Sequence, residues 1–310
     1  MNQNNLKSMA LEFEISLKIQ GLADKTIKET LRKLGKFFDY LSSRGITHVD
    51  TITKEMVKTY QVELYQHINL KGQLNCIATQ NKMLSAVKLF LSFLKDNDYI
   101  IEDPAGDIHY AKEPQKLPRS ILTISEARKI MHSPDKKSVI GYRDRTILEV
   151  LYSSGIRKTE LANLQVSDVD YNEGILRIEG KGKKERVVPI GKIACRYLEN
   201  YISSVREELI KDPPNNYLFL SIRGKKLSKD VVRMSIKKYA RGAGIKKNVH
   251  CHTFRHTCAT HMLKNKANIR IIQELLGHTC LNSTQIYTHI TITDLKEVHR
   301  RCHPREQDRE

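Results

Sequence analysis

A stretch with several prolines and a glycine, residues 103–118, divides the chain into two parts with different apolar patterns. It contains Pro104, Gly106, Pro114 and Pro118 and has little apolar periodicity, which is typical of an extended linker. A chain of 310 residues has room for two domains that each bury an apolar core. We therefore expect domains at residues 1–103 and 119–310, joined by a linker at residues 104–118.

The part before the linker has a helical pattern throughout. Apolar residues recur at spacings of three and four, for example from Ile27 to Leu41. This pattern predicts four helices between residues 6 and 100. Thr26 and Glu29 have the spacing of a capping box, which predicts that the second helix begins there.

The part after the linker mixes two periods. Helical patterns cover residues 125–132 and 138–154, and they return from residue 192 onwards. Between them, residues 174–179 and 185–190 alternate in polarity on either side of a glycine-containing turn, which predicts a β-hairpin. Residues 217–220 are a further strand candidate. The expected fold class is mainly α with a small β-sheet or hairpin, in which a helical domain precedes an α+β domain.

The chain is strongly basic, with 53 Lys and Arg against 35 Asp and Glu and a formal net charge of +18. A field of that sign attracts polyanions, so nucleic acid is the expected partner. A membrane surface could use the same charge, but no apolar run approaches the roughly 20 residues that a transmembrane helix needs. Residues 1–8 lack the apolar core of a signal peptide. We therefore expect no membrane partner and a cytoplasmic protein.

Cationic and imidazole side chains are spread over the second half of the chain without a cluster of carboxylates. This combination favours a phosphodiester attacked by a group of the protein rather than by metal-bound water. The candidate residues are Arg157, Lys181, His252, Arg255, His278 and Tyr287.

His252 and Arg255 are three residues apart at the start of a helical segment, so both side chains can reach one phosphate. An arginine fork matches two phosphate oxygens, and a second arginine can hold the remaining negative charge of a five-coordinate phosphorus. Arg157, close to Gly155, is the candidate for that second role.

The proposed chemistry also needs a proton donor and a nucleophile. Lys181, at the tip of the predicted hairpin, can give a proton to the departing sugar oxygen. Lys183 and Lys184 lie on the same turn, and any of the three lysines could instead contact the phosphate backbone. The hydroxyl of Tyr287, with an ordinary pKa of about 10, can be activated by neighbouring cations and a histidine base.

Five segments, with matching order and spacing, resemble the signature boxes of the tyrosine recombinase, or phage integrase, family. The segments are SGIRKTEL (154–161), GKGKKERVVPI (180–190), HTFRH (252–256), LLGH (275–278) and STQIYTH (283–289). The resemblance implies that Arg157, Lys181, His252, Arg255, His278 and nucleophilic Tyr287 form the catalytic set. It also implies that Glu160 braces the active-site arginine.

Residues 6–100 resemble the helical core-binding domain of this family, which forms a C-shaped clamp around duplex DNA together with the catalytic domain. The family's chemistry implies a 3′-phosphotyrosyl bond, a free 5′-hydroxyl and a Holliday junction, without ATP, metal or another cofactor. It further implies a homo-tetramer on synapsed double-stranded DNA sites, with a possible accessory protein or partner recombinase.

The ending Cys302-His-Pro-Arg resembles the tail of Xer-type recombinases, so helix 293–303 is expected to dock on the neighbouring subunit. No room remains before Leu6 for the arm-binding domain of larger phage integrases. A Xer-like enzyme is therefore favoured, although recombinases of transposons and small phages share this layout. The target sequence and the biological role stay open.

Other functions fit the sequence less well. The lysine turn lacks the Gly-Lys-Ser/Thr of a phosphate-binding loop, and the His and Cys residues between 250 and 258 match no common zinc finger. A two-metal nuclease would need carboxylates that are missing here. The alternative from another class is a catalytically inactive, architectural DNA-binding protein. His256, His261 and His289 are expected to be packed histidines.

Overall fold

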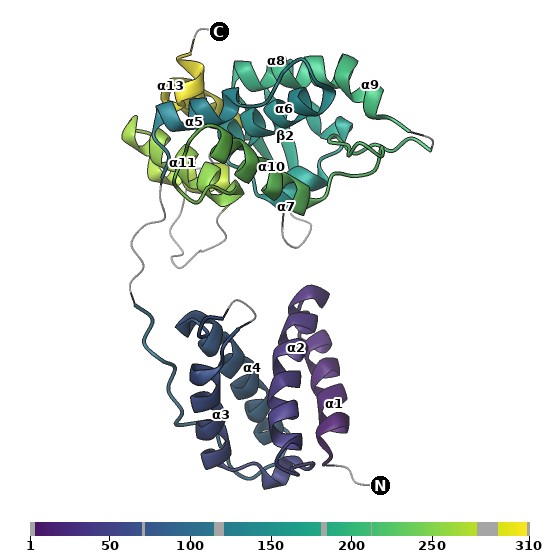
Figure 1. Cartoon of the computed structure of the whole chain (residues 1–310), viewed down its shortest axis with the longest axis vertical. Coiled ribbons are helices and arrows are strands. Elements are labelled where there is room, and N and C mark those ends of the chain that lie inside the picture. The colour runs from purple at the N-terminus through teal and green to yellow at the C-terminus, as the bar shows by residue number, and fades with distance from the viewer. Residues whose placement is uncertain are drawn as a thin grey trace. The chain divides into compact units, whose positions relative to one another are not determined.

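The computed structural model describes residues 4–69, 72–114, 121–180, 185–211, 213–277 and 291–308. It divides into two compact units, Met1–Lys116 and Leu117–Glu310 (Figure 1). Each unit has its own buried apolar cluster.

The first unit is helical in its described residues. Its helices are α1 (Leu6–Ile19), α2 (Asp24–Ser42), α3 (Lys54–Gln66) and α4 (Ile77–Asp96), as the apolar spacing predicts. Aromatic side chains hold the helices together: the ring centroids of Phe13 and Phe90 lie 5.4 Å apart in an edge-to-face arrangement. Phe37 and Tyr60, from α2 and α3, lie 4.9 Å apart. The apolar faces of these helices therefore meet in one core.

The predicted start of α2 is wrong by nearly one turn, because the N-cap residue is Ala23 rather than Thr26. The helix begins at Asp24, and its N-cap residue, Ala23, makes no side-chain capping bond. The N–H of Thr26 instead donates to the Ala23 carbonyl at 2.7 Å, so Thr26 lies inside the first turn. Asp24 places negative charge at the positive end of the helix dipole.

The second unit contains a three-stranded antiparallel sheet in the order β1-β2-β3, formed by β1 (Val169–Asp170), β2 (Ile175–Glu179) and β3 (Glu185–Pro189). The predicted hairpin is therefore present, with the short β1 added at its edge. Leu176 of β2 pairs with Val188 of β3, and both are buried. The alternation that predicted the hairpin thus reflects one face turned to the core.

The second unit is otherwise mainly helical in its described residues (Figure 1). Its helices are α5 (Ile124–His132), α6 (Val139–Ser154), α7 (Lys158–Asn163), α8 (Lys192–Asn200), α9 (Arg206–Leu209), α10 (Lys229–Gly242), α11 (Cys251–Lys264), α12 (Ile269–Leu276) and α13 (Ile292–Cys302). Short helical turns occur at η1 (Val49–Thr51), η2 (Val166–Asp168), η3 (Tyr201–Val205) and η4 (Pro304–Glu306). Residues 217–220 form isolated bridges at Tyr217 and Leu220 rather than the strand that their apolar run suggested.

The helix α6 crosses the middle of the second unit and is buried from Arg143 to Ser154. Its core-facing polar groups are paired, as in the 2.7 Å ion pair between Arg145 and Glu149. Ser138 caps the start of α6 by accepting from the Gly141 N–H at 3.1 Å, and Gly155 ends the helix. Across the described residues, none of the helices combines the length and the apolar character needed to span a bilayer.

Candidate active site

Two glycines in the left-handed conformation end the helices that frame the site. Gly155 follows α6 with φ 62°, and Gly277 follows α12 with φ 63°. Glycine adopts this conformation without the steric penalty of other residues. The last carbonyls of a helix lack intrahelical partners and carry the negative end of its dipole. These helix ends therefore offer acceptors for cationic side chains.

Arg255 on α11 uses both helix ends. Its Nη1 donates to Gly155 O at 2.8 Å and its Nη2 to Leu276 O at 2.6 Å. The side chain is buried, with 5% of the residue exposed. Burial, with the nearby positive charge of Arg157, lowers the pKa of Arg255 to about 10. The guanidinium therefore remains charged at neutral pH.

Arg157 lies next to it from a different segment. Its Nη2 donates to Gly277 O at 3.0 Å, the carbonyl that follows the one bound by Arg255. Its Nη1 donates to Glu160 Oε1 at 2.8 Å, and its backbone N–H donates to Glu160 Oε2 at 2.8 Å. The Arg157 side chain is 37% exposed, so part of this cation faces solvent.

Glu160 is the anion of this group. It is buried on α7 and also receives a fork from Arg186 of β3, with Nη1 to Oε1 at 3.1 Å and Nη2 to Oε2 at 2.9 Å. Burial alone would raise the pKa of Glu160, but hydrogen bonds from Arg186 and Arg157 outweigh it, so its pKa lies below the ordinary value. Arg157 and Arg186 thus share one carboxylate, while Arg255 binds backbone carbonyls, so this arginine cluster (Arg157, Arg186, Arg255 and Glu160) holds three guanidiniums and one carboxylate and remains positive.

Arg186 was not among the residues expected from the sequence. A signal was available, because alternate residues of a strand share a face and Arg186 is two positions before the buried Val188. A cation on the inner face of a hairpin strand needs a buried partner, and Glu160 is that partner.

His252 stands one turn before Arg255 on α11 and is exposed at the surface. Packing against its ring, together with the positive charge of His250, Arg255 and neighbouring groups, lowers its pKa below the ordinary value. His252 therefore stays neutral at pH 7 and can accept a proton.

Two of the neighbouring histidines differ in burial. His261 is buried and bonded, with its Nδ1 2.7 Å from Tyr152 Oη and its Nε2 2.9 Å from Leu122 O, as a packed histidine should be. His256 is exposed, so the expectation that it is packed is wrong. In an α-helix a residue one position after a buried arginine turns towards a different face, which explains the exposure.

The other predicted site residues lie outside the described residues. Lys181, Lys183 and Lys184 belong to the connection between β2 and β3, and His278 and Tyr287 follow Gly277 in the chain. The structure thus brings together Arg157, Arg255 and Glu160, with His252 on the helix of Arg255. Within the ranges that the structure describes, no three His, Cys, Asp or Glu side chains are grouped to hold a metal ion.

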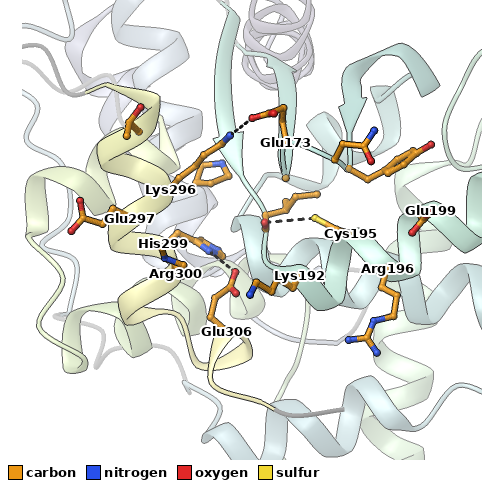
Figure 2. Close-up of a pocket in the computed structure, with 16 residues that line it drawn as sticks. Glu173, Lys192, Cys195, Arg196, Glu199, Lys296, Glu297, His299, Arg300 and Glu306 are labelled. Atoms are coloured by element: carbon orange, nitrogen blue, oxygen red, sulfur yellow. Dashed lines mark hydrogen bonds and ion pairs between the residues drawn. The ribbon is translucent and has the colours of Figure 1, made fainter.

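A cavity of about 630 Å³ lies elsewhere in the second unit, and none of the arginine cluster lines it. Its walls come from the turn between β1 and β2, from α8 and from α13 (Figure 2). Across it, Lys296 Nζ of α13 pairs with Glu173 Oε2 at 2.8 Å, and His299 Nδ1 lies 3.4 Å from Glu306 Oε1. This cavity therefore borders the C-terminal helix rather than the cationic site.

Known proteins match nearly the whole length of this chain. Residues 120–293 match the model of the phage integrase family, and residues 12–98 match the model of the phage integrase N-terminal SAM-like domain. Tyrosine recombinase XerD of Staphylococcus epidermidis is 38% identical over 286 residues, which cover 92% of this chain and 95% of that protein. XerD of Staphylococcus aureus is 36% identical over the same shares.

Solved structures show the same fold at lower identity. The lambda integrase tetramer bound to a Holliday junction has a TM-score of 0.69 and 18% identity, covering 93% of this chain and 80% of that one. XerH site-specific recombinase bound to its difH substrate has a TM-score of 0.61 and 21% identity, covering 86% and 76%. With the family model matched over the second unit and XerD aligned over nearly the whole chain, this protein belongs to the phage integrase family of tyrosine recombinases, as a Xer-like site-specific recombinase.

Proposed function

We propose that this recombinase breaks and rejoins DNA strands through a covalent bond between Tyr287 and a 3′ phosphate. The observation that supports this best is the pair of hydrogen bonds from Arg255 to Leu276 O and from Arg157 to Gly277 O. Both guanidiniums are thereby fixed at the end of α12, and the segment that contains His278 and Tyr287 follows this end in the chain. A positive site at that position suits the charge of a pentacoordinate phosphate.

In the proposed first step the Tyr287 oxygen bonds to phosphorus, and the bond from phosphorus to the 5′ oxygen breaks. Neutral His252, with His278, takes the phenolic proton, and Lys181 gives a proton to the leaving 5′ oxygen. Arg157 and Arg255 hold the non-bridging oxygens.

The second step reverses the first with a different nucleophile. The 5′-hydroxyl of the partner strand attacks the phosphotyrosine, and Tyr287 leaves. Each step replaces one phosphate ester by another, so the reaction is neutral in bond count and is proposed to need neither ATP nor a metal.

The proposed substrate is double-stranded DNA bound by both units. The +18 charge supports it, and Lys183 and Lys184 are proposed backbone contacts. We assign residues 1–103 to core binding, 104–118 to the linker and 119–310 to catalysis, in line with the matched family models. A homo-tetramer that forms a Holliday junction follows by analogy with the lambda integrase complex, and a cytoplasmic location and a partner recombinase belong to the same proposal.

The C-terminal helix bears on assembly. In the single chain, α13 packs on its own unit through buried Leu295 and Val298, and Lys296 pairs with Glu173 (Figure 2). We propose that helix 293–303 takes the equivalent seat on a neighbouring subunit in the DNA-bound tetramer. That exchange requires α13 to detach from its own unit.

A nicked duplex that contains the recognition site tests the proposal, because loss of the short fragment traps the covalent intermediate. The wild-type chain should give a DNA adduct that resists SDS, and Tyr287→Phe should abolish the adduct while DNA binding remains. Tyr171→Phe is the matched control, because Tyr171 lines the cavity beside α13 rather than the arginine cluster.

Two outcomes would contradict the proposal. Binding without any wild-type adduct would indicate an architectural DNA-binding protein, and cleavage blocked by EDTA would indicate a metal mechanism. The role of Lys181 has its own test: Lys181→Ala should slow cleavage, and a substrate with a 5′-thiolate leaving group should restore the rate because sulfur leaves without a proton.

A further inference from the structure

Proposed catalytic groups lie on three segments that are linked to Arg186. Arg186 contacts the segment of Arg157 and the segment of Gly277, and its own strand follows the segment of Lys181. It binds Glu160, which holds Arg157. It also packs against Gly277, where an added Cβ would come within 2.9 Å of Arg186 Nε and 3.0 Å of its Cζ. The strand itself, β3, follows the connection that contains Lys181 in the chain.

The guanidinium is largely shielded, with 15% of the side chain exposed. Both terminal nitrogens are used by Glu160, and among the described residues the buried Nε has no hydrogen-bond partner. An unpaired buried N–H destabilises the fold. An arginine that only adds one salt bridge could remain at the surface and avoid this destabilising burial. The buried position of Arg186 therefore indicates a further role.

We propose that Arg186 is a positioning residue for strand cleavage, which rests on the proposed function above. Its fork fixes the plane of the Glu160 carboxylate, and the carboxylate in turn fixes the direction of Arg157. Its contact with Gly277 sets the end of α12 against β3. Arg157 and Arg255 thereby keep one alignment, with the end of α12 held against β3.

Charge supports the same role. With Arg186 present, the negative charge of Glu160 is divided between two guanidiniums, so Arg157 keeps more of its positive charge for a phosphate. Without Arg186, Glu160 pairs with Arg157 alone and draws it away from Gly277 O. Lysine is not equivalent at this position because an ammonium has no planar fork to hold a carboxylate in one plane.

The test is the single-turnover rate of adduct formation on the nicked duplex at saturating DNA, with the full chain. Arg186→Gln should slow cleavage by about 10- to 100-fold, the effect of a small misplacement of reacting groups. Its affinity for DNA should stay within about twofold of the wild type, since Arg186 acts through Glu160 and Gly277. Arg177→Gln, an exposed arginine of β2 in the same sheet, should cleave at the wild-type rate.

The 5′-thiolate substrate separates positioning of the arginines from proton donation. It should restore the rate of Lys181→Ala and leave Arg186→Gln slow, since the latter lacks alignment rather than a proton. Equal rescue of both variants would overturn the inference by assigning Arg186 to the lysine hairpin alone.

Arg186→Lys keeps the charge and serves if the Gln variant fails to fold. It should also cleave slowly, and wild-type cleavage by either variant would overturn the inference. The proposed function fails separately, because only its failure removes the Tyr287 adduct from the wild-type chain.

Discussion

Arg157 and Arg255 donate hydrogen bonds to consecutive carbonyls at the end of one helix, Gly277 O at 3.0 Å and Leu276 O at 2.6 Å. Two like charges placed so closely repel each other, and this repulsion contributes to the lowered pKa of Arg255. The negative end of the α12 dipole offsets it. The spacing of the two cations therefore depends on how α12 terminates.

The termination of α12 can be tested by Gly277→Ala. The change forces an alanine to φ 63° and places its Cβ about 3 Å from the Arg186 guanidinium. Gly244→Ala is the matched control, because Gly244 has φ 71° with nothing within 4 Å of an added Cβ. We expect Gly277→Ala to lower the free energy of unfolding by about 1–3 kcal/mol more than the control, from overpacking. Equal losses in urea denaturation would contradict this account of the contact.

Glu160→Gln removes the anion shared by Arg157 and Arg186. The loss of two charge-assisted interactions should lower the free energy of unfolding by about 1–3 kcal/mol at pH 7. The folded-state pKa of Glu160 lies below its ordinary 4.5, so its ionised form stabilises the fold above that value, and this contribution is lost as the pH falls through the folded pKa. The difference in the free energy of unfolding between the wild type and Glu160→Gln should therefore decrease below pH 4.5.

Urea denaturation at a series of pH values between 3 and 8 would measure this difference in the free energy of unfolding. Glu208→Gln, a change at an exposed carboxylate, should differ little from the wild type across the range. A difference that persists unchanged at pH 3 would show that Glu160 stabilises the fold by packing rather than by charge.

Local patterns predicted the helical first unit and the β2–β3 hairpin because apolar period and burial coincide there. Tyr217 and Leu220 show where this fails: residues 218–220 are all buried, and a short, continuously buried apolar run has no period to distinguish a strand from irregular chain. At the site, spacing on one helix placed His252 and Arg255 together. The bond from Arg186 to Glu160 joins separate elements, and only tertiary structure brings it into view.

The protonation of His252 gives a further prediction. Because its pKa lies below the ordinary 6.5, its ring is mostly neutral at pH 6.5 and takes up most of its proton at lower pH. The part of the single-turnover cleavage rate that depends on this base should therefore decline at lower pH than it would with a histidine of ordinary pKa. Proton NMR of the ring, assigned by the signal missing from His252→Asn, would give the midpoint.

The same NMR titration of His252 in denaturant gives the pKa of the ring in the unfolded chain, which serves as the reference. A folded-state midpoint at or above that reference would contradict the lowered pKa. It would also argue against neutral His252 as the proton acceptor at neutral pH.

A buried ion pair of η4 anchors the C-terminal tail, whereas α13 makes a more exposed ion pair. Variants of the two ion pairs should therefore differ in stability. Arg305 is 3% exposed and forks onto buried Glu149 of α6, with Nη2 to Oε1 at 2.6 Å and Nε to Oε2 at 3.0 Å. Arg305→Met should lower the free energy of unfolding by about 1–3 kcal/mol, because buried Glu149 loses two charge-assisted hydrogen bonds but keeps its ion pair with Arg145. Lys296→Met breaks the more exposed pair with Glu173 and should lose less than about 1 kcal/mol. Hydrogen exchange should show α13 opening in the first variant and remaining protected in the second, and equal exchange in both would mean that Arg305 does not hold the tail on its own unit.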